Sequence, residues 1–499
     1  MRIAFIAAEC EPWAKTGGLA DVVDALARAL GRLPDGPTLP VEVFLPRYRS
    51  VPVPPDSPSR AVEVTDPASP SGRTVVRLVE VAANGYRLRL VDHPPAFDRP
   101  GIYGDGPTDY PDSGWRFGLL CRTALTVLAA ERPPVDVLHL HDWHACPVAL
   151  LRETAFAADP TIARAAVVLT LHNLAYHGWL PAADLGQLGL APGDGVVAAD
   201  ATGLDLLRAG VERAEMVTTV SPTYAREALT PEFGFGLEDA LGALGDRFVG
   251  ILNGLDPEVW NPATDPTIAA RYSASDLEGK ATCRRALLAE LGLDPTDSGP
   301  VAAMIGRLDP QKGFDLLTGA APAILAAGGR LVVLGTGNPK LVAGLRRLVR
   351  RRPGRIALVE RFDRDLARRI YAGSDVFLMP SRFEPCGQGQ MIALRYGTPP
   401  IVRRTGGLAD TVVDVTIDPE RGTGFVFEAA TPDALAAACR RAFEVRGDGR
   451  SAAWLGLVRR GMVVDFAWER RSAPAYLRVY ARAIALRRVG ERARAGGAI

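Results

Sequence analysis

The N-terminal stretch Met1 to Leu30 reads MRIAFIAAECEPWAKTGGLADVVDALARAL. Its apolar run from Arg2 to Ala8 predicts a buried β-strand, and the paired glycines Gly17 and Gly18 then predict a tight turn. A strand, a glycine turn and a helix in this order open a βαβ unit, which predicts a parallel sheet. The helix is indicated by apolar residues at three- and four-residue spacing, the pattern of a helix that packs on a sheet: Leu19, Val22, Val23, Leu26 and Leu30.

Short apolar runs bounded by Gly, Pro or Asp recur along the rest of the chain, with helical patterns between them. With 499 residues, the chain is also longer than one hydrophobic core usually organises. We therefore predict an α/β protein made of two doubly wound, Rossmann-like domains. The strands expected in the first are Arg2 to Ala8, Val41 to Pro46, Val135 to His141, Ala166 to Leu171 and Met216 to Val220; those expected in the second are Val301 to Ile305, Arg330 to Leu334, Arg355 to Leu358, Val376 to Met379 and Pro400 to Val402.

The segment Val249 to Tyr272 is the predicted connection between the domains, because it carries several prolines and little helical periodicity. We place the first domain at residues 1–250 and the second at residues 251–470. Residues 471–499 are expected to form a C-terminal helix that crosses back to the first domain and ends, after Arg487, in a frayed tail.

Two segments of the first domain depart from the βαβ pattern. Thr74 to Val91 holds two alternating runs around Asn84-Gly85, a dipeptide typical of a type I′ hairpin turn, so we expect an antiparallel appendage there. The stretch Val51 to Gly72 is rich in Pro and Ser and poor in aliphatic residues. It is predicted to be an exposed or mobile loop.

Charge and cysteine usage argue against several classes of function. The chain has 58 Lys and Arg against 57 Asp and Glu, so it has no general field for a polyanion and we expect no nucleic-acid partner. Its apolar runs are shorter than the roughly 18 residues of a membrane span, and the N-terminal run is too short for a signal peptide, which predicts a cytoplasmic protein without a membrane partner. The cysteines lack disulfide or zinc spacing: Cys10, Cys121, Cys146, Cys283, Cys386 and Cys439.

The hexapeptide TGGLAD occurs twice, at Thr16 to Asp21 and at Thr405 to Asp410. Each copy follows a predicted strand and opens a helix. Paired glycines let backbone N–H groups approach a ligand, and a helix N-terminus favours an anion, so such a loop suits a phosphate or sugar hydroxyls. The alternative is a tight turn that binds nothing. Lys15 favours binding, because it places a cation directly before the first copy.

Charged side chains also follow two strands of the second domain. Arg307 and Lys312 lie in GRLDPQKG at the carboxyl end of a strand, where doubly wound sheets bind ligands. Two cations there suit a diphosphate, and ordinary surface charges are the alternative. Glu384 follows a later strand and would reach the same site, with backbone N–H groups of Gly387 to Gln390 facing a phosphate. Compensation of a helix dipole is a second role open to this carboxylate.

Five of the six histidines lie between His139 and His177, in the segments HLHDWH and LHNLAYHG. These segments end successive predicted strands. The cluster resembles a metal site, but Asp142 directly follows His141, which breaks the HxHxDH spacing, and no third strand completes a ligand set. We therefore predict no metal, and a polar wall of a binding site instead.

Taken in order, these segments resemble those of the bacterial glycogen synthases and plant starch synthases, which are retaining glucosyltransferases of the two-Rossmann-domain (GT-B) type. The resemblance covers nearly the whole chain and implies two domains that face each other across a deep cleft. The motifs that carry it are KTGGLADV near the start, HDWHA, LHNLAYHG, TPEFGFGLE (Thr230 to Glu238), ILNGLD (Ile251 to Asp256), GRLDPQKG, PSRFEPCG, LRYGTPP and TGGLADTV.

The resemblance implies transfer of glucose from ADP-glucose to the non-reducing 4-hydroxyl of an α-1,4-glucan such as glycogen, without a cofactor or metal. The first domain would be the acceptor side and the second would bind the nucleotide sugar; a homo-oligomer is also compatible. Catalytic roles are implied for Arg307 and Lys312 on the phosphates, Glu384 on the glucose hydroxyls, His172 near the glucose C6 hydroxyl and reacting carbon, and Asp142. Substrate-binding roles are implied for Lys15, Gly17, Gly18, Tyr103, Asn173, Asn253, Gly387, Gln388, Gly389, Thr405, Gly406 and Gly407.

Two routes to retained configuration stay open. A double displacement needs a carboxylate nucleophile, for which Asp142 and Glu384 are the candidates, whereas a same-face attack is assisted by the leaving phosphate. The resemblance favours the same-face route. The chain also departs from the family pattern EPCGLTQ, because Gln388 and Gly389 replace Leu and Thr; downstream, Ile392 and Ala393 replace a usual Tyr-Gly pair.

Other functions follow from the same features. A related transferase that uses UDP-glucose or a small acceptor is the first alternative, although the lysine loop at Lys15 argues against it. A catalytically weakened glucan-binding relic is the second, and the changes at Gln388 and Gly389 keep it open. An oxidoreductase is disfavoured, because the first βαβ unit has no GxGxxG followed by an acidic residue about 20 positions later.

Overall fold

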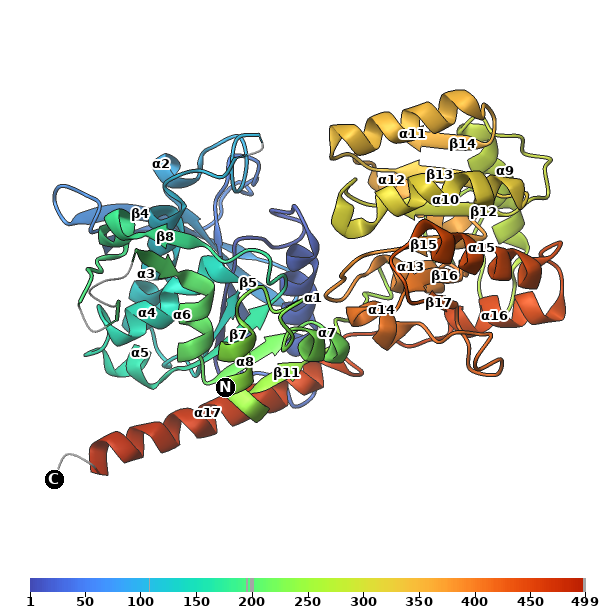
Figure 1. Ribbon diagram of the computed structural model, residues 1–499. Coiled ribbons are helices and arrows are strands. Elements are labelled where there is room, and N and C mark those ends of the chain that lie inside the picture. Colours follow the sequence, from blue (N-terminus) through green and yellow to red (C-terminus); the bar gives the residue numbers. More distant parts are fainter. Residues whose placement is uncertain (107, 194–195, 198–201, 497–499) are drawn as a thin grey trace. The chain divides into compact units, whose positions relative to one another are not determined.

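The computed structural model describes residues 1–106, 108–193, 196–197 and 202–496 (Figure 1). The chain forms two compact units. Unit 1 comprises Met1–Gly254 and Trp468–Ile499, and unit 2 comprises Leu255–Ala467. No helix in the described ranges is both long and apolar enough to cross a membrane.

Unit 1 is built on a nine-stranded sheet in the order β11-β10-β7-β6-β1-β2-β5-β4-β3. Every pair from β11 to β5 is parallel, and the β5-β4 and β4-β3 pairs are antiparallel. A separate antiparallel pair is formed by β8 and β9. The strands are β1 (Ile3–Ile6), β2 (Val41–Pro46), β3 (Ser59–Thr65), β4 (Arg73–Ala82), β5 (Tyr86–Asp92), β6 (Val137–His141), β7 (Ala166–Leu171), β8 (Trp179–Pro181), β9 (Gly203–Asp205), β10 (Met216–Thr219) and β11 (Phe248–Gly250).

Helices cover this sheet. In Figure 1, α3, α4 and α6 lie to the left of β7 and α1 lies to the right, and α1 packs on β2 while α17 packs on β7. The helices are α1 (Gly18–Arg32), α2 (Pro94–Phe97), α3 (Ser113–Ala130), η1 (Trp143–Ala145), α4 (Pro147–Glu153), α5 (Pro160–Arg164), η2 (Ala182–Leu188), α6 (Leu206–Arg213), α7 (Pro222–Glu227), α8 (Glu238–Leu244), η3 (Gly245–Arg247) and α17 (Ser472–Gly496), where η marks a 3₁₀ helix.

The structure corrects two predictions about the edge of this sheet. The supposed loop from Val51 to Gly72 contains β3, which pairs with β4 through its full length. Only Val62 and Val64 of β3 are buried, so the alternation that marks an edge strand is short and was obscured by the prolines and serines around it. The hairpin at Asn84-Gly85 is confirmed, but it is no appendage, because β5 pairs in parallel with β2.

Unit 2 holds a six-stranded, fully parallel sheet in the order β14-β13-β12-β15-β16-β17. The five predicted strands are confirmed to within a residue, and the short β17 was not predicted. Its strands are β12 (Val301–Ile305), β13 (Arg330–Leu334), β14 (Ile356–Val359), β15 (Val376–Met379), β16 (Pro400–Arg403) and β17 (Phe425–Phe427); its helices are α9 (Glu278–Glu290), η4 (Pro310–Lys312), α10 (Phe314–Ala326), α11 (Pro339–Arg351), α12 (Arg364–Gly373), α13 (Gly389–Arg395), α14 (Gly406–Thr411), α15 (Pro432–Arg446) and α16 (Ala452–Met462).

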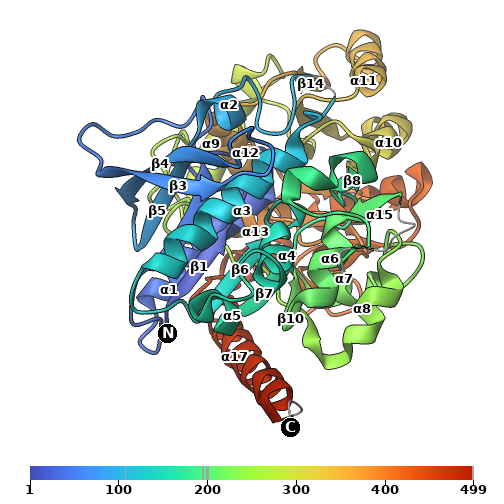
Figure 2. The same cartoon turned by 90° about the vertical axis from the view of Figure 1, so that its left-hand side faces the viewer.

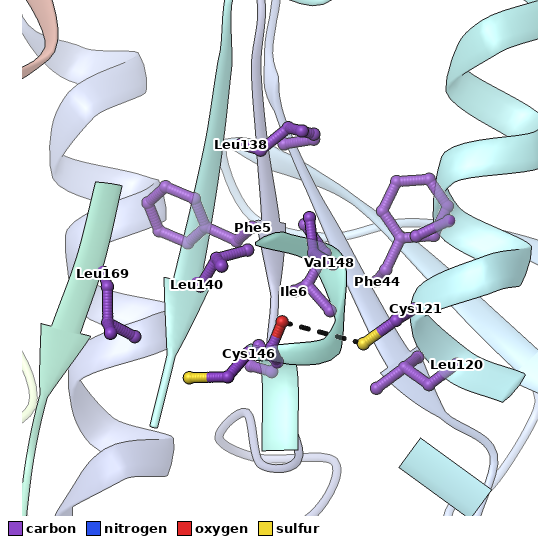
Figure 3. Close-up of a cluster of buried hydrophobic side chains, with 14 of the residues drawn as sticks. Phe5, Ile6, Phe44, Leu120, Cys121, Leu138, Leu140, Cys146, Val148 and Leu169 are labelled. Atoms are coloured by element: carbon purple, nitrogen blue, oxygen red, sulfur yellow. Dashed lines mark hydrogen bonds between the residues drawn. The ribbon is translucent and has the colours of Figure 1, made fainter. Parts of the chain in front are cut away.

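The core of unit 1 lies between its sheet and the helices (Figure 3). Phe5 of β1, Leu140 of β6 and Leu169 of β7 are fully buried there. Cys121 of α3 belongs to the same cluster, and burial raises the pKa of its thiol. All six cysteines are free and buried, as expected for structural thiols.

The last helix, α17, closes unit 1. Figure 2 shows it extending from the lower edge of the unit, and it contacts α1, β6, β7 and β10. Tyr476 and Tyr480 on this helix are fully buried among the core residues of the sheet. The helix continues to Gly496, well past Arg487, after which a frayed tail was predicted.

Candidate functional site

Each sheet has one point at which its strand order reverses direction. In unit 1 this point lies between β1 and β6, and in unit 2 it lies between β12 and β15. Doubly wound sheets bind ligands outside the carboxyl ends of the two strands that flank such a point. Of the predicted site residues, Lys15, Gly17, Gly18, Asp142, Arg307, Lys312, Glu384, Gly387, Gln388 and Gly389 follow these four strands, and the others come from neighbouring loops.

In unit 2, a buried carboxylate joins the two loops. The Lys312 ammonium donates to both oxygens of Glu384, at 2.8 and 2.7 Å, and the Ser381 hydroxyl donates to Oε2 at 2.9 Å. Lys312 follows β12 in the 3₁₀ helix η4, and Glu384 follows β15. The Glu384 side chain is only 6% exposed, against 28% for Lys312. Paired in this way, the carboxylate is fixed in position at the edge of the sheet.

Arg307 behaves differently from Lys312, although both lie in the same loop. Its side chain is 55% exposed, and its nearest ion-pair partner is Asp309, with Nε and Oδ2 3.6 Å apart. The two cations of this loop are therefore not equivalent, because the charge of Lys312 is already offset by Glu384. Arg307 is the cation of this loop that is placed to meet an incoming anion.

The second TGGLAD copy packs on the backbone of the Glu384 loop. The Gly407 N–H donates to the carbonyl oxygen of Glu384 at 3.1 Å. A Cβ at Gly406 would lie 1.9 Å from that same carbonyl oxygen, and one at Gly407 would lie 2.2 Å from the carbonyl oxygen of Cys386. Thr405 is buried as well. The glycines are thus required by the packing of this loop against the protein itself.

Gly389, one of the positions where the chain departs from the pattern EPCGLTQ, is packed closely by its neighbours. A Cβ at Gly389 would lie 3.0 Å from Cε1 of Phe377 and 3.3 Å from the hydroxyl of Tyr371. These two rings occupy the space beside Gly389, so a larger residue at this position would require them to move. Gln390 is fully buried and donates to the carbonyl oxygens of Cys386 and Gly387, which holds the turn ahead of α13.

In unit 1, the first TGGLAD copy is held by a residue that was not predicted, Glu9. Its carboxylate accepts the N–H groups of Thr16 and Gly17 at 2.5 and 3.0 Å, and the Thr16 hydroxyl at 2.7 Å. The Tyr103 hydroxyl donates to it at 2.5 Å. The Gly17 amide, which we expected to face a ligand, is therefore already occupied by the protein. The sequence signal that could have identified Glu9 was an acidic residue directly after an apolar strand, and the structure shows that it is buried.

The exposed part of this loop begins at Lys15 and extends to Gly18. Lys15 lies 2.5 Å from Asp21 and 3.5 Å from Glu11, measured from Nζ to the carboxylate oxygens. Apart from adjacent residues and the helix's own backbone, no atom lies within 4 Å of the place that a Cβ would take at Gly17 or Gly18. The protein itself leaves the space beside both glycines open.

Asp142 follows β6 with an unusual backbone, φ 56° and ψ −176°, a region that disfavours residues with a Cβ. Its carboxylate accepts the N–H of His172 at 2.7 Å and that of Asn173. Burial raises the pKa of this carboxyl to about 7, against the lowering effect of the two N–H groups. Backbone strain and a raised pKa are typical of functional sites, so Asp142 stays a candidate for such a role.

His172 lies beside Asp142 and faces a second histidine. Its Nε2 is 3.0 Å from Nδ1 of His141, the last residue of β6. Burial lowers the pKa of His172 to about 3 and that of His141 well below its usual range, so both rings are neutral at physiological pH. Within the described ranges, no group of three or more His, Cys, Asp or Glu side chains could hold a metal ion.

The structure thus gathers most predicted residues into two sets. Unit 1 brings Gly17 and Tyr103 together through Glu9, and Asp142 together with His172 and Asn173. Asn253, also in unit 1, is buried and its Oδ1 has no hydrogen-bond partner among the described residues. Unit 2 joins Lys312, Glu384, Gly406 and Gly407. Ser381, like Glu9, was missed, since a single serine carries no sequence signal.

Comparison with protein families finds the same division of the chain. Residues 2–243 match the family model described as "Starch synthase catalytic domain", and residues 299–444 match that described as "Glycosyl transferases group 1". The "Glycogen synthase" of Anaeromyxobacter dehalogenans is 44% identical over 96% of this chain and 99% of its own length. That of Syntrophotalea carbinolica is 41% identical over 97% of this chain and 99% of its own length.

Two solved structures show the same similarity. The catalytic domain of starch synthase IV from Arabidopsis thaliana, bound to ADP and acarbose, superposes with a TM-score of 0.87 and 34% identity, over 97% of this chain and 99% of that one. The sucrose-phosphate synthase of Thermosynechococcus elongatus shares the fold at a TM-score of 0.58 and 20% identity, with the same coverage.

Proposed function

Because the chain belongs to the family of bacterial glycogen synthases and plant starch synthases, it is a glycosyltransferase, and we propose that it extends an α-1,4-glucan with glucose from ADP-glucose. The glucose would be added to the non-reducing 4-hydroxyl with retained configuration. The relative of known structure was solved with ADP and acarbose, which supports a nucleotide product and a sugar ligand.

The observation that carries this proposal is the Lys312–Glu384–Ser381 group at the point where the sheet of unit 2 reverses its order. A fixed carboxylate that points out of a doubly wound sheet suits the hydroxyls of a sugar, which donate to it. Its neighbouring cations suit the diphosphate of a sugar nucleotide. We therefore assign Glu384 to glucose, and Arg307 with Lys312 to the phosphates.

In the reaction, the bond between glucose C1 and the β-phosphate oxygen of ADP-glucose breaks, and C1 bonds to the acceptor 4-oxygen. Negative charge develops on the departing ADP, and Arg307 and Lys312 stabilise it. We propose no metal for this role, since two cations of the protein already lie in this loop. In unit 1, we assign Lys15, Tyr103, Asp142, His172 and Asn173 to recognition of the sugar substrates.

The route to retention follows from the state of the two carboxylates. Both oxygens of Glu384 accept hydrogen bonds from Lys312, and one also accepts from Ser381, so three of its roughly four acceptor sites are engaged and its charge is offset. Asp142 is held by two backbone N–H groups and is partly protonated near neutral pH. Neither is a free nucleophile. We therefore favour same-face attack, in which the acceptor hydroxyl gives its proton to the leaving phosphate oxygen.

A direct assay tests the proposal. Purified protein with glycogen should release ADP from ADP-glucose and lengthen the glucan, and UDP-glucose should be a poorer donor when assayed in parallel. Preferred turnover of UDP-glucose would reassign the donor and leave the fold and transfer chemistry intact. Failure of both donors would contradict the enzyme assignment and support a glucan-binding relic, which the unusual Gln388 and Gly389 keep under consideration.

We also propose that the protein acts in the cytoplasm. The six free, buried cysteines suit a reducing compartment, and the described residues include no helix able to cross a membrane. Fractionation of cells that express the tagged protein, with glycogen-bound material assayed separately, would test this.

A further inference from the structure

The contact between His141 and His172 has an asymmetry that bears on the reaction. His141 is fully buried, and its Nδ1 lies 3.0 Å from Nε2 of His172. The other ring nitrogen of His141, Nε2, is also buried and has no hydrogen-bond partner among the described residues. His172 is only half-buried. One imidazole of the pair is thus enclosed by protein, and the other is accessible.

The burial of both rings keeps them neutral, so each carries one N–H and one bare nitrogen. Two arrangements satisfy the 3.0 Å contact. If His172 donated from Nε2, His141 would carry its hydrogen on Nε2, as a buried N–H without an acceptor. If His141 donates from Nδ1, only a lone pair of His141 stays unpartnered. Buried N–H groups without acceptors are rarer than under-used acceptors, which selects the second arrangement.

We propose that His141 is a positioning residue that holds His172 in the tautomer with its proton on Nδ1, so that His172 presents an N–H donor to the sugar substrate. This inference rests on the proposed function, because it assigns His172 to an oxygen of the transferred glucose. In the opposite tautomer, the same face of His172 would be an acceptor, and it could no longer donate to that oxygen.

The surroundings of His141 explain how its ring is kept in place. Its ring centroid lies 4.2 Å from that of His139 and 5.1 Å from that of Phe5. His139 is itself fixed at both nitrogens: Nε2 lies 2.6 Å from the Thr170 hydroxyl, and Nδ1 lies 2.9 Å from the Tyr480 hydroxyl of α17. A rigid neighbour leaves His141 little freedom to turn away from His172.

Two substitutions change the partner of His172 in different ways. In H141L, an apolar residue of similar size fits the buried position and leaves Nε2 of His172 without a donor. In H141D, a carboxylate accepts a hydrogen from Nε2 and so reverses the tautomer or protonates the ring. We expect kcat to fall roughly tenfold to 100-fold in H141L, the effect of one misplaced hydrogen bond, with a smaller change in the KM for ADP-glucose.

The matched control is Y480F. It removes a buried hydrogen bond from the same cluster, at His139, but leaves the His141–His172 contact intact. We expect Y480F to lower the melting temperature while kcat stays within about twofold of the unaltered protein. An equal loss of kcat in Y480F and H141L would show that the cluster acts only through stability and would overturn the proposal.

A measurement without substrate separates this inference from the proposed activity. Long-range ¹H–¹⁵N correlation spectra of protein labelled at its six histidines report which ring nitrogen carries hydrogen, and H172N identifies the His172 signals. We expect the Nδ1–H form in the unaltered protein, a mixture in H141L and the Nε2–H or doubly protonated form in H141D. An unchanged Nδ1–H signal in H141L would refute the role of His141, even if glucan synthesis is confirmed. If only H141D folds, an unchanged Nδ1–H signal in that variant would refute it equally. If the protein transfers no glucose, the spectra still decide what His141 does.

Discussion

The two copies of TGGLAD have the same sequence and opposite relations to the protein around them. In unit 2, Thr405, Gly406 and Gly407 are buried, and the glycines touch the backbone at Glu384 and Cys386. In unit 1, Gly17 and Gly18 are exposed, and apart from adjacent residues and the helix's own backbone no atom lies within 4 Å of the place that a Cβ on either would take. One copy needs glycine for its own packing. The other leaves open space of the kind that a closely approaching ligand would use.

The copies are also anchored differently. The first is held by the side chain of Glu9, which accepts from Thr16 and Gly17. The second is held by the main-chain carbonyl of Glu384, whose side chain is left to Lys312 and Ser381. The same hexapeptide therefore uses a carboxylate as an anchor in unit 1, and in unit 2 it leaves a carboxylate available to a ligand.

Alanine at the glycines should give the largest difference between the copies. G406A and G407A place a Cβ 1.9 and 2.2 Å from carbonyl oxygens of the Glu384 loop, and we expect unit 2 to lose about 3 kcal/mol or more of unfolding free energy. G17A and G18A should stay within about 0.5 kcal/mol of the unaltered protein. Urea unfolding followed by fluorescence measures both.

Transfer assays on the same variants test the ligand side of this comparison. G17A should fold normally and yet lose affinity for substrate, seen as a raised KM. A G17A variant with unchanged kinetics would show that the open space in unit 1 is not used. Comparable destabilisation by G17A and G406A would remove the distinction between the copies altogether.

Glutamine at the two anchoring glutamates should give the next largest contrast. E9Q places an amide NH₂ against groups that already donate, so we expect a stability loss of about 2 kcal/mol. E384Q keeps the main-chain bond to Gly407, but it turns an amide NH₂ toward Lys312 or Ser381, so we expect a similar stability loss of about 2 kcal/mol. The contrast lies in kcat, which should fall on the order of 100-fold in E384Q, because the charge facing the sugar is gone, and much less in E9Q. Parallel unfolding and kinetic measurements separate the two effects, and an equal loss of kcat in both variants would contradict the contrast.

The sequence was sufficient to predict the parallel centre of both sheets, because buried parallel strands repeat a local pattern of apolar run, turn and helix. It failed at β3, where the inward face shows only Val62 and Val64, and at β17, which has three residues. Short edge strands owe their structure to a neighbouring strand, and that pairing is not local in sequence.

Lys312, Glu384 and Asp142 could be named as candidates because each stands in a family motif, and their roles stay predictions. The contacts between the site residues could not be predicted from the sequence. The ion pair between Lys312 and Glu384 joins residues 72 positions apart, and Glu9 reaches Tyr103 across 94. Such contacts depend on which strands become neighbours in the sheet, so composition and spacing do not reveal them.

Asp142 offers a smaller effect that depends on pH. Its pKa is raised to about 7 in the folded protein, so the folded state holds this proton more tightly than the unfolded state does. Its contribution to stability is therefore present below the ordinary pKa near 4 and is lost as the pH rises through 7. D142N cannot ionise, and we expect it to gain roughly 1–3 kcal/mol relative to the unaltered protein between about pH 5 and pH 8, less than the full shift implies because the residue is half-buried.

Denaturant unfolding at several pH values, with both proteins in the same buffers, measures this difference. Asparagine also tolerates the positive φ of this position, so backbone strain should be nearly the same in both. A stability difference that does not change across this range of pH would show that Asp142 titrates in its ordinary range.

Lys15 should give the smallest change in stability and one of the clearest in function. It is exposed at the start of the open glycine loop, and its partners Asp21 and Glu11 are themselves accessible to solvent. Surface ion pairs of this kind contribute little, so K15A should change the unfolding free energy by less than about 0.5 kcal/mol. If the loop in unit 1 serves a ligand, K15A should raise the KM for ADP-glucose while the melting temperature stays the same.

The matched control is R49A, which removes an exposed ion pair to Asp98 elsewhere in unit 1 and should leave KM unchanged. Equal kinetics for K15A and R49A would exclude Lys15 from the site and leave the first copy as a turn held by Glu9.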